Sequence, residues 1–294
     1  MGGLEGPPKP PALGSAPAEP ERSSAPDTPP RSSGPRKAGP VVEAGRSSTR
    51  RVPIDRGDSV TFDRAETRHI ARVLRLRPGD TIIASDGNGC DYTVRLEALG
   101  EIATGTVLGV VSRDDEPTLR ITLVQGVPKA DKMEAIVRAA TELGVSRVWP
   151  VVTERTIVRL DPARWRERAR RWQRVVKEAT KQCGRATIPE VASPLPIVEL
   201  LDRLGPVAPA GTLRLCLWEG DAPPLRRVLD LRHEVTEVLV LIGPEGGLAR
   251  GEVEAARDRG WQVASLGSRI LRTETAGPAA IAIIQFHLGD LAIS

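Results

Sequence analysis

The segment Leu271-Arg272-Thr273-Glu274-Thr275 carries a cation and a carboxylate two residues apart in a polar cluster. A glutamate can accept a proton from a reacting group, and an arginine can stabilise negative charge that develops on that group. Arg272 and Glu274 could therefore serve a reaction in which a group loses a proton and carries transient negative charge. A structural ion pair explains Glu274 nearly as well, so both roles stay open for this residue.

A glycine-rich loop, Gly243-Pro244-Glu245-Gly246-Gly247, follows the apolar run 237–242. Glycine lets the backbone approach a ligand closely or adopt positive φ. The loop matches neither the G-x-G-x-x-G fingerprint of dinucleotide sites nor the phosphate-binding P-loop. Segments 217–220 and 266–270 also follow apolar runs, and ligands of open α/β sheets bind beyond the carboxyl ends of strands. Together with 271–275, these loops predict one shared ligand site.

Such loops need a parallel sheet to hold them, and the sequence from residue 121 onward has the matching pattern. Apolar runs typical of buried parallel strands alternate with helical segments. The runs are 120–127, 147–152, 213–219, 237–243 and 261–267. The alternation predicts an α/β domain with a parallel sheet.

The helices of this domain have sequence signals at their ends. Asp131 is expected to cap a first helix, with Glu134 completing a capping box and Gly144 ending it. A second helix is expected from 161 to 183, because Asp161-Pro162 favour a start and Gly184 an end. A third follows Glu274, where Gly277-Pro278 predict a shifted start.

The predicted helix 161–183 divides into an apolar stripe and a basic face. Residues 155–185 hold 11 Lys or Arg against three acids. A solvated helix face usually mixes signs, so this excess predicts contact with the phosphates of RNA or DNA. The stripe follows alternating steps of four and three residues, is interpreted as core packing, and consists of Trp165, Ala169, Trp172, Val176, Ala179 and Cys183.

The first half of the chain has a different character. Residues 1–40 contain 11 prolines, 6 glycines and 5 serines, a composition that buries too little apolar surface to fold, so 1–48 is predicted to be a disordered tail. From 59 to 113, short β-rich pieces alternate with turns, and a helical pattern at 65–76 interrupts them. This spacing suggests a small barrel, and the domain is placed at 49–115.

Composition excludes several classes of protein. The three cysteines and three histidines are dispersed, so neither a disulfide framework nor a metal site is expected. The sequence contains no run of 18 apolar residues, the length that could span a membrane. A cytoplasmic protein is expected. The sequence pI of about 9.2 fits a polyanionic partner.

Several stretches together resemble the RsmE family of ribosomal RNA uridine-N3 methyltransferases, in the SPOUT superfamily. They run in the family's order from about residue 50 to the end, namely RHIARVLRLRPGD, PKADKMEAIVRAATELGV, TERTIVRL, RWQRVVKEATKQCGRATIPEV, LIGPEGGL and LGSRILRTETA. The resemblance implies a PUA-like barrel at 49–115, followed at 116–294 by an α/β domain with a C-terminal trefoil knot. It also implies S-adenosylmethionine as cofactor, a homodimer, and 16S ribosomal RNA of the small subunit as partner.

The resemblance gives the candidate site residues their expected roles. Arg272 is expected to stabilise charge on the uracil while Glu274 takes the N3 proton. The expected cofactor-binding residues are Leu217, Trp218, Glu219, Gly243, Pro244, Gly246, Leu266, Gly267, Ile270, Leu271, Arg272, Thr273 and Ala276. The expected RNA-binding residues are Arg51, His69, Arg72, Arg75, Lys129, Lys132, Arg155, Arg166, Arg170, Arg174, Lys181 and Arg185.

Two other functions stay open on the residues alone. One is a related SPOUT enzyme that methylates a ribose hydroxyl or another base nitrogen. The other is a non-catalytic RNA-binding protein of ribosome assembly, which the basic helix and the barrel would serve equally well.

Overall fold

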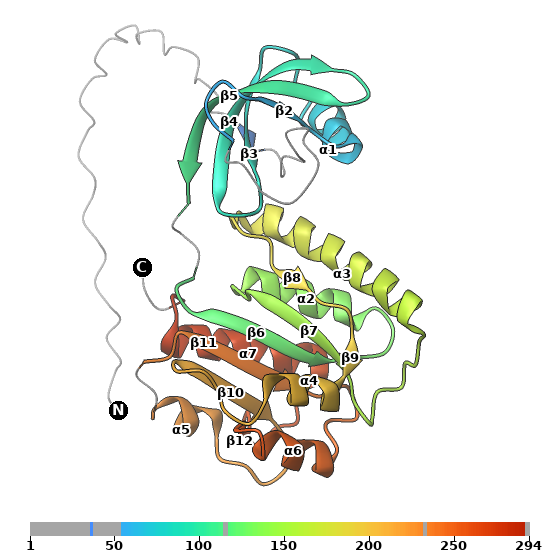
Figure 1. Cartoon of the computed structure of the whole chain (residues 1–294), viewed down its shortest axis with the longest axis vertical. Helices are drawn as coiled ribbons and strands as arrows, with labels where there is room; N and C mark the ends of the chain where they lie inside the picture. Colours follow the sequence, from blue (N-terminus) through green and yellow to red (C-terminus); the bar gives the residue numbers. More distant parts are fainter. Residues whose placement is uncertain (1–35, 38–53, 114–116, 232–233, 292–294) are drawn as a thin grey trace, which may run out of the picture. The chain divides into compact units, whose positions relative to one another are not determined.

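The computed structural model describes residues 36–37, 54–113, 117–231 and 234–291 (Figure 1). Every described residue belongs to one compact unit of the chain, 35–294. Most of the predicted tail, and Arg51 among the predicted RNA-binding residues, lie outside the described residues.

The smaller domain is built on a five-stranded sheet with the order β1-β3-β4-β5-β2. Its β-rich character was predicted, and alternate residues such as Val60, Ile82 and Val94 are fully buried in its core. The predicted helix is split into an α-helix, α1, and a π-helical turn, η1. The bounds are β2 Ser59–Thr61, α1 Arg64–Arg68, η1 His69–Val73, β3 Thr81–Ser85, β4 Cys90–Leu99 and β5 Ala103–Ser112.

A two-residue strand, β1 (Arg36–Lys37), lies within the segment predicted as tail and pairs in parallel with β3. The prediction of a tail without order did not include it. Strand pairing uses backbone N–H and C=O groups, which every sequence supplies. The low apolar content of the segment therefore does not prevent this pairing.

The larger domain contains a seven-stranded sheet with the order β12-β10-β11-β6-β7-β8, and β9 pairs with β7. All of its pairings are parallel, which confirms the predicted sheet. The bounds are β6 Arg120–Gly126, β7 Arg147–Val152, β8 Glu190–Val191, β9 Leu195–Pro196, β10 Thr212–Leu217, β11 Glu237–Ile242 and β12 Gln262–Ala264.

Both faces of this sheet are covered by helices (Figure 1). Along β11, Val238 and Val240 pack into one hydrophobic cluster, and Leu239 and Leu241 pack into another. The first cluster also holds side chains of α2, α3, α5 and α7, and the second holds those of α4 and α6. The bounds are α2 Lys132–Glu142, α3 Pro162–Cys183, α4 Ile197–Leu204, α5 Leu225–Leu229, α6 Arg250–Arg257 and α7 Thr273–Leu288.

The residues predicted to begin and end α3 are confirmed. The Asp161 carboxylate accepts hydrogen bonds from the backbone N–H groups of Ala163 (2.9 Å) and Arg164 (3.0 Å). Gly184 ends the helix with φ 76°, the left-handed conformation that glycine adopts without strain. The apolar stripe from Trp165 to Ala179 is buried, and only Cys183, the last residue of the helix, is exposed.

Two other predictions about helix starts are wrong. The Asp131 side chain makes no cap, because Arg171 binds both Asp131 (3.5 Å) and Glu134 (2.5 Å) and draws the carboxylates away from the backbone. α7 begins at Thr273 and contains Pro278, so its start is not shifted. We attribute the tolerated proline to the burial of Ala280, Ile281 and Ile284 further along the helix, which stabilises a helix that lacks one N–H donor.

Arg214 is buried in β10, within a run predicted to be apolar. Its guanidinium donates to the carbonyls of Gly205 (2.7 Å), Leu204 (2.8 Å), Arg259 (3.0 Å) and Val207 (3.2 Å). Burial lowers the pKa of this side chain. The four acceptors pair its two terminal nitrogens and offset part of the cost of burial, while Nε has no hydrogen-bond partner among the described residues. Arg214 thus ties the ends of α4 and α6 to the sheet.

Candidate active site

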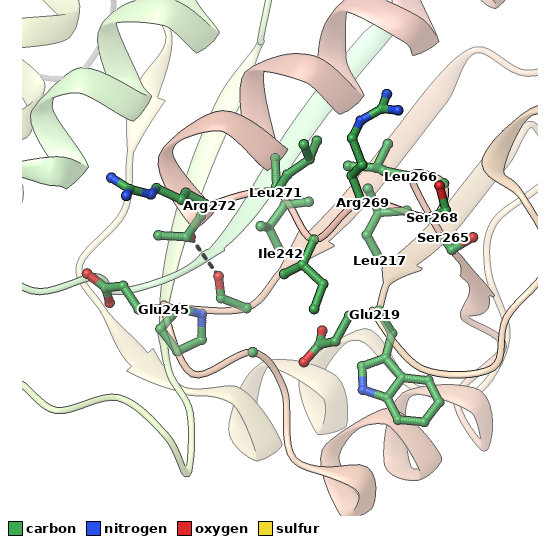
Figure 2. Close-up of a pocket in the computed structure, with 18 of the residues that line it drawn as sticks. Leu217, Glu219, Ile242, Glu245, Ser265, Leu266, Ser268, Arg269, Leu271 and Arg272 are labelled. Atoms are coloured by element: carbon green, nitrogen blue, oxygen red, sulfur yellow. Dashed lines mark hydrogen bonds between the residues drawn. The ribbon is translucent and has the colours of Figure 1, made fainter.

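A cavity of about 370 Å³ lies at the carboxyl ends of β10, β11 and β12, where the sequence predicted it (Figure 2). In Figure 2, Arg272 and Glu245 lie at one end of this pocket, and Ser265 and Ser268 at the other. Its size is that of a small-molecule site. The lining residues are Lys132, Leu217, Trp218, Glu219, Ile242, Gly243, Pro244, Glu245, Gly247, Ser265, Leu266, Gly267, Ser268, Arg269, Ile270, Leu271, Arg272, Thr273 and Ala276.

The structure brings together all but one of the residues predicted to bind a cofactor. Gly246 does not line the cavity, and its carbonyl accepts a hydrogen bond from Arg155 (2.7 Å) instead. The prediction missed other lining residues, although most of them adjoin a predicted one. The missed residues are Ile242, Glu245, Gly247, Ser265, Ser268 and Arg269, and Lys132 was assigned to RNA binding.

Two glycines of the 243–247 loop are required by the geometry. A Cβ on Gly243 would stand 2.7 Å from the carbonyl carbon of Gly247. Gly247 has φ 70°, and a Cβ there would also collide with the Glu219 carboxylate. The loop therefore folds back on itself only because these side chains are absent.

A buried polar network joins the glycine loop to the start of α7. The Thr273 hydroxyl donates to the Gly243 carbonyl (2.7 Å) and accepts a hydrogen bond from the Gln125 amide (2.9 Å). Gln125 is fully buried at the end of β6, in a run that was predicted to be apolar. The network holds two walls of the cavity, 243–247 and 271–276, in a fixed relation.

Replacing Thr273 with valine tests this network. Valine keeps the shape but removes the hydroxyl that bridges the Gly243 carbonyl and the Gln125 amide, which then keep only the hydrogen bonds from Gln125 to the carbonyls of Gly126 (3.0 Å) and Gly243 (3.4 Å). We therefore expect the free energy of unfolding to fall by about 1 kcal/mol. We also expect ligand affinity in the cavity to fall by about tenfold, which corresponds to 1.4 kcal/mol. Denaturant titration and calorimetric titration measure the two effects. Thr273→Ser keeps the hydroxyl and should match the wild type; a valine variant that also matches it would contradict the role of the network.

Lys132, the first residue of α2, connects the two loops through their acids. Its Nζ lies 3.2 Å from Glu245 Oε1 and 3.2 Å from Glu274 Oε2. The backbone N–H of Lys129 also donates to the Glu245 carboxylate (3.2 and 3.3 Å). Lys132 lines the cavity, and Glu274 does not. Glu274 therefore contacts a residue of the cavity wall, Lys132, without itself lining the cavity.

Lys132 and Glu274 are both charged near neutral pH. A hydrogen bond involving its own backbone, and then the Lys132 ammonium, hold the pKa of Glu274 below its usual value. The hydrogen bond to Glu274 and the neighbouring Glu245 raise the pKa of Lys132, against the opposing effect of desolvation. Glu274 is therefore an anion, and a weaker proton acceptor than a free glutamate.

Arg272 is exposed, lines the cavity and makes no ion pair with a described residue. It is the N-cap of α7, with extended backbone (φ −64°, ψ 150°), which sets the direction in which its side chain leaves the loop. An exposed guanidinium at the cavity rim has its five N–H donors available for an incoming acceptor.

The structure separates the predicted RNA-binding residues into free and engaged groups. Arg166, Arg170 and Arg174 are exposed along α3, and we call them the basic face. Lys181 pairs with the buried Glu66, and Arg185 donates to the carbonyls of Thr141 and Val145. His69 and Arg72 lie in η1, followed by Arg75 with φ 53°.

Within the described ranges, no three His, Cys, Asp or Glu side chains gather in a way that would hold a metal ion. No helix among those residues is long and apolar enough to cross a membrane.

Comparison with protein families identifies the class of protein to which this sheet, cavity and small β domain belong, that of RNA methyltransferases. Residues 114–285 match the model of the RNA methyltransferase domain, and residues 62–103 match that of the RNA methyltransferase PUA domain. The first match alone spans more than half of the chain.

More specifically, the chain belongs to the ribosomal RNA small subunit methyltransferase E family, RsmE. It is 35% identical to the Synechocystis member over 226 residues, 77% of this chain and 72% of that one. It is 32% identical to the Mycobacterium tuberculosis member over 233 residues, 78% and 87% of the two chains.

Solved structures of similar proteins share the fold. The Neisseria gonorrhoeae family member bound to S-adenosyl methionine has a TM-score of 0.74 at 34% identity, covering 87% of this chain and all of that one. A putative methyltransferase from Legionella pneumophila, also with the cofactor, has a TM-score of 0.75 at 26% identity, covering 87% and 99%.

Proposed function

We propose that this protein methylates N3 of a specific uridine in small-subunit ribosomal RNA, with S-adenosylmethionine as the methyl donor. The observation that carries the proposal is a small-molecule cavity whose rim holds two cations, Arg272 and Lys132. Membership of the RsmE family supports it. We also propose that the protein acts in the cytoplasm, because its substrate is a ribosomal RNA.

The cavity fits the cofactor in size and in chemistry. Leu217, Ile242 and Leu266 offer apolar surface for a flat purine ring. Glu219 makes no ion pair or side-chain hydrogen bond with any described residue, which leaves its carboxylate for hydroxyl or ammonium groups of a ligand. When bound, S-adenosylmethionine supplies an electrophilic methyl group on a positively charged sulfur.

The residues at the rim suit an imide nitrogen as methyl acceptor. Uridine N3 must lose its proton before its electron pair forms the bond to the methyl carbon, while the pair of the broken carbon–sulfur bond stays on sulfur. The lost proton goes to solvent, directly or through a nearby acceptor. As it leaves, negative charge spreads onto the uracil oxygens, where a positioned cation lowers the barrier. Arg272 provides such a cation.

The basic face of α3 is proposed to bind the RNA backbone, since its three exposed arginines make no ion pair with a described residue and are available for phosphates. The PUA domain, with His69, Arg72 and Arg75, provides further contacts. The trefoil knot implied by the family is part of the same proposal.

We further propose that the protein is a homodimer that packs through α7. Ile281 and Ile284 of this helix are buried in the core. Phe286 is 67% exposed and Ile283 40% exposed, and Ile270, in the preceding loop, is 84% exposed. A helix that is apolar on both sides needs a second partner. Sedimentation equilibrium measures the mass, and a monomer at micromolar concentration would contradict the dimer.

The central experiment incubates the protein with S-adenosylmethionine and small ribosomal subunits that lack the modification. Digestion of the RNA and chromatography of the nucleosides should yield 3-methyluridine. A ribose-methylated nucleoside would instead support a related enzyme of another specificity. Cofactor binding without any product, on subunits that a known family member modifies, would support a non-catalytic assembly factor.

A further inference from the structure

Lys132 has three features that together set it apart from the other cations of the site. It lines the cavity, and its ammonium lies 3.2 Å from one carboxylate in the glycine loop and 3.2 Å from another in the first turn of α7. It is also the first residue of a helix anchored in the core by Met133, Ile136 and Val137. An ammonium has three N–H donors. The two carboxylates engage at most two of these donors, so at least one N–H remains for a ligand in the cavity.

We propose that Lys132 is a catalytic residue whose ammonium, held by Glu245 and Glu274, binds a carbonyl oxygen of the target uracil as N3 is deprotonated. The inference rests on the proposed function, since it assigns a second cation to the same uridine. It also gives Glu274 a positioning role. The carboxylate acts through Lys132 rather than on the N3 proton.

The surrounding charges explain why a lysine is held in this place. Each carboxylate is on a segment that forms a wall of the cavity, Glu245 in the glycine loop and Glu274 in the first turn of α7. Arg272 is also close enough to Glu274 to lower the pKa of its carboxyl. On its own helix, Lys132 is followed by Glu134, which is bound by Arg171. A cation fixed by such contacts needs little reorganisation when charge develops on a substrate.

In this role Lys132 gives up no proton and forms no covalent bond. The N3 proton goes to solvent, the N3 electron pair forms the nitrogen–methyl bond, and the ammonium keeps its own protons throughout. Lys132 lowers the energy of the uracil anion, so that more of the bound uridine is deprotonated at a given pH.

The test compares Lys132→Gln, Lys132→Arg and the wild type in single-turnover methylation across a range of pH. Glutamine removes the charge but still donates hydrogen bonds to the carboxylates. We expect Lys132→Gln to lower the rate near neutral pH by about 100-fold. Its pH–rate profile should lie about two units higher, because each tenfold change in deprotonation corresponds to one unit. Arginine, which keeps the charge, should restore part of the rate.

Arg138→Gln is the matched control, because Arg138 is an exposed cation on the same helix, outside the cavity; it should behave as the wild type. Melting curves and cofactor titration accompany the kinetics. A purely structural lysine predicts an equal loss of rate at every pH, with a lower melting temperature or weaker cofactor binding. That result, or a Lys132→Gln protein at the wild-type rate, would overturn the inference.

The failure of the proposed function gives a different result. In that case the wild-type protein itself forms no 3-methyluridine, whatever the variants do. A wild type that forms 3-methyluridine alongside an unaffected Lys132→Gln variant would remove only the role of Lys132.

Discussion

Replacing Arg272 with alanine should lower the rate of the methyl-transfer step by about 100-fold or more, because a cation at the developing charge contributes to the transition state rather than to binding. The guanidinium is exposed at the rim of the cavity and makes no ion pair with a described residue. Its removal therefore leaves no buried charge unpaired, and the melting temperature should hardly change. Single-turnover kinetics with saturating cofactor and RNA measures the step directly.

Arg272→Lys should restore little of this activity, since a compact ammonium does not reproduce a planar pair of N–H donors. Arg250→Ala is the control, because Arg250 is an exposed arginine on α6 that binds only Glu254 (2.9 Å) among the described residues. If Arg272→Ala weakens RNA binding and leaves the single-turnover rate intact, Arg272 binds the substrate without assisting the chemistry.

Five strands of the parallel sheet, the three loops and most of the cavity could be predicted from the sequence, for a local reason; the two-residue strands β8 and β9 were not predicted. Apolar runs followed by glycine or polar residues mark strand ends, and all strands of a parallel sheet end at one edge. Leu217, Gly243 and Leu266 are far apart in sequence, yet each follows such a run, and the structure brings them into one cavity.

The role of Lys132 could not be predicted in this way. Its position beside Glu245 and Glu274 depends on the strand order, which places β6 next to β11 and brings the start of α2 to the glycine loop. No local pattern encodes that order. From the sequence alone, Lys132 is one of twelve residues predicted to bind RNA, and nothing local distinguishes it from the others.

Buried polar residues are a second feature that the apolar pattern of the strands does not predict. Gln125 and Arg214 lie in runs that are otherwise apolar, where strand periodicity treats a polar residue as an interruption. Most of their acceptors lie outside their own strands: the Thr273 hydroxyl and the Gly243 carbonyl for Gln125, and four backbone carbonyls for Arg214. Burial is favourable only with these partners, and the partners are visible only in the fold.

Reversing the basic face of α3, with Arg166, Arg170 and Arg174 all changed to Glu, should weaken RNA binding by about 100-fold or more at moderate salt. Each lost phosphate contact reduces the release of counterions, so the slope of log affinity against log salt should become less steep by up to about 0.7–0.9 per contact. Filter binding or anisotropy over a series of salt concentrations measures both quantities. Cofactor affinity should stay unchanged, because none of the three residues lines the cavity.

The matched control reverses Arg226, Arg227 and Arg250, which are also exposed but lie on α5 and α6. It changes the net charge by the same amount, so a general loss of attraction for RNA would appear in both variants. A loss confined to the α3 variant locates the phosphate contacts on that helix. If both variants bind RNA alike, the basic face is a solvated surface, and the RNA must be held by the PUA domain and the rim of the cavity.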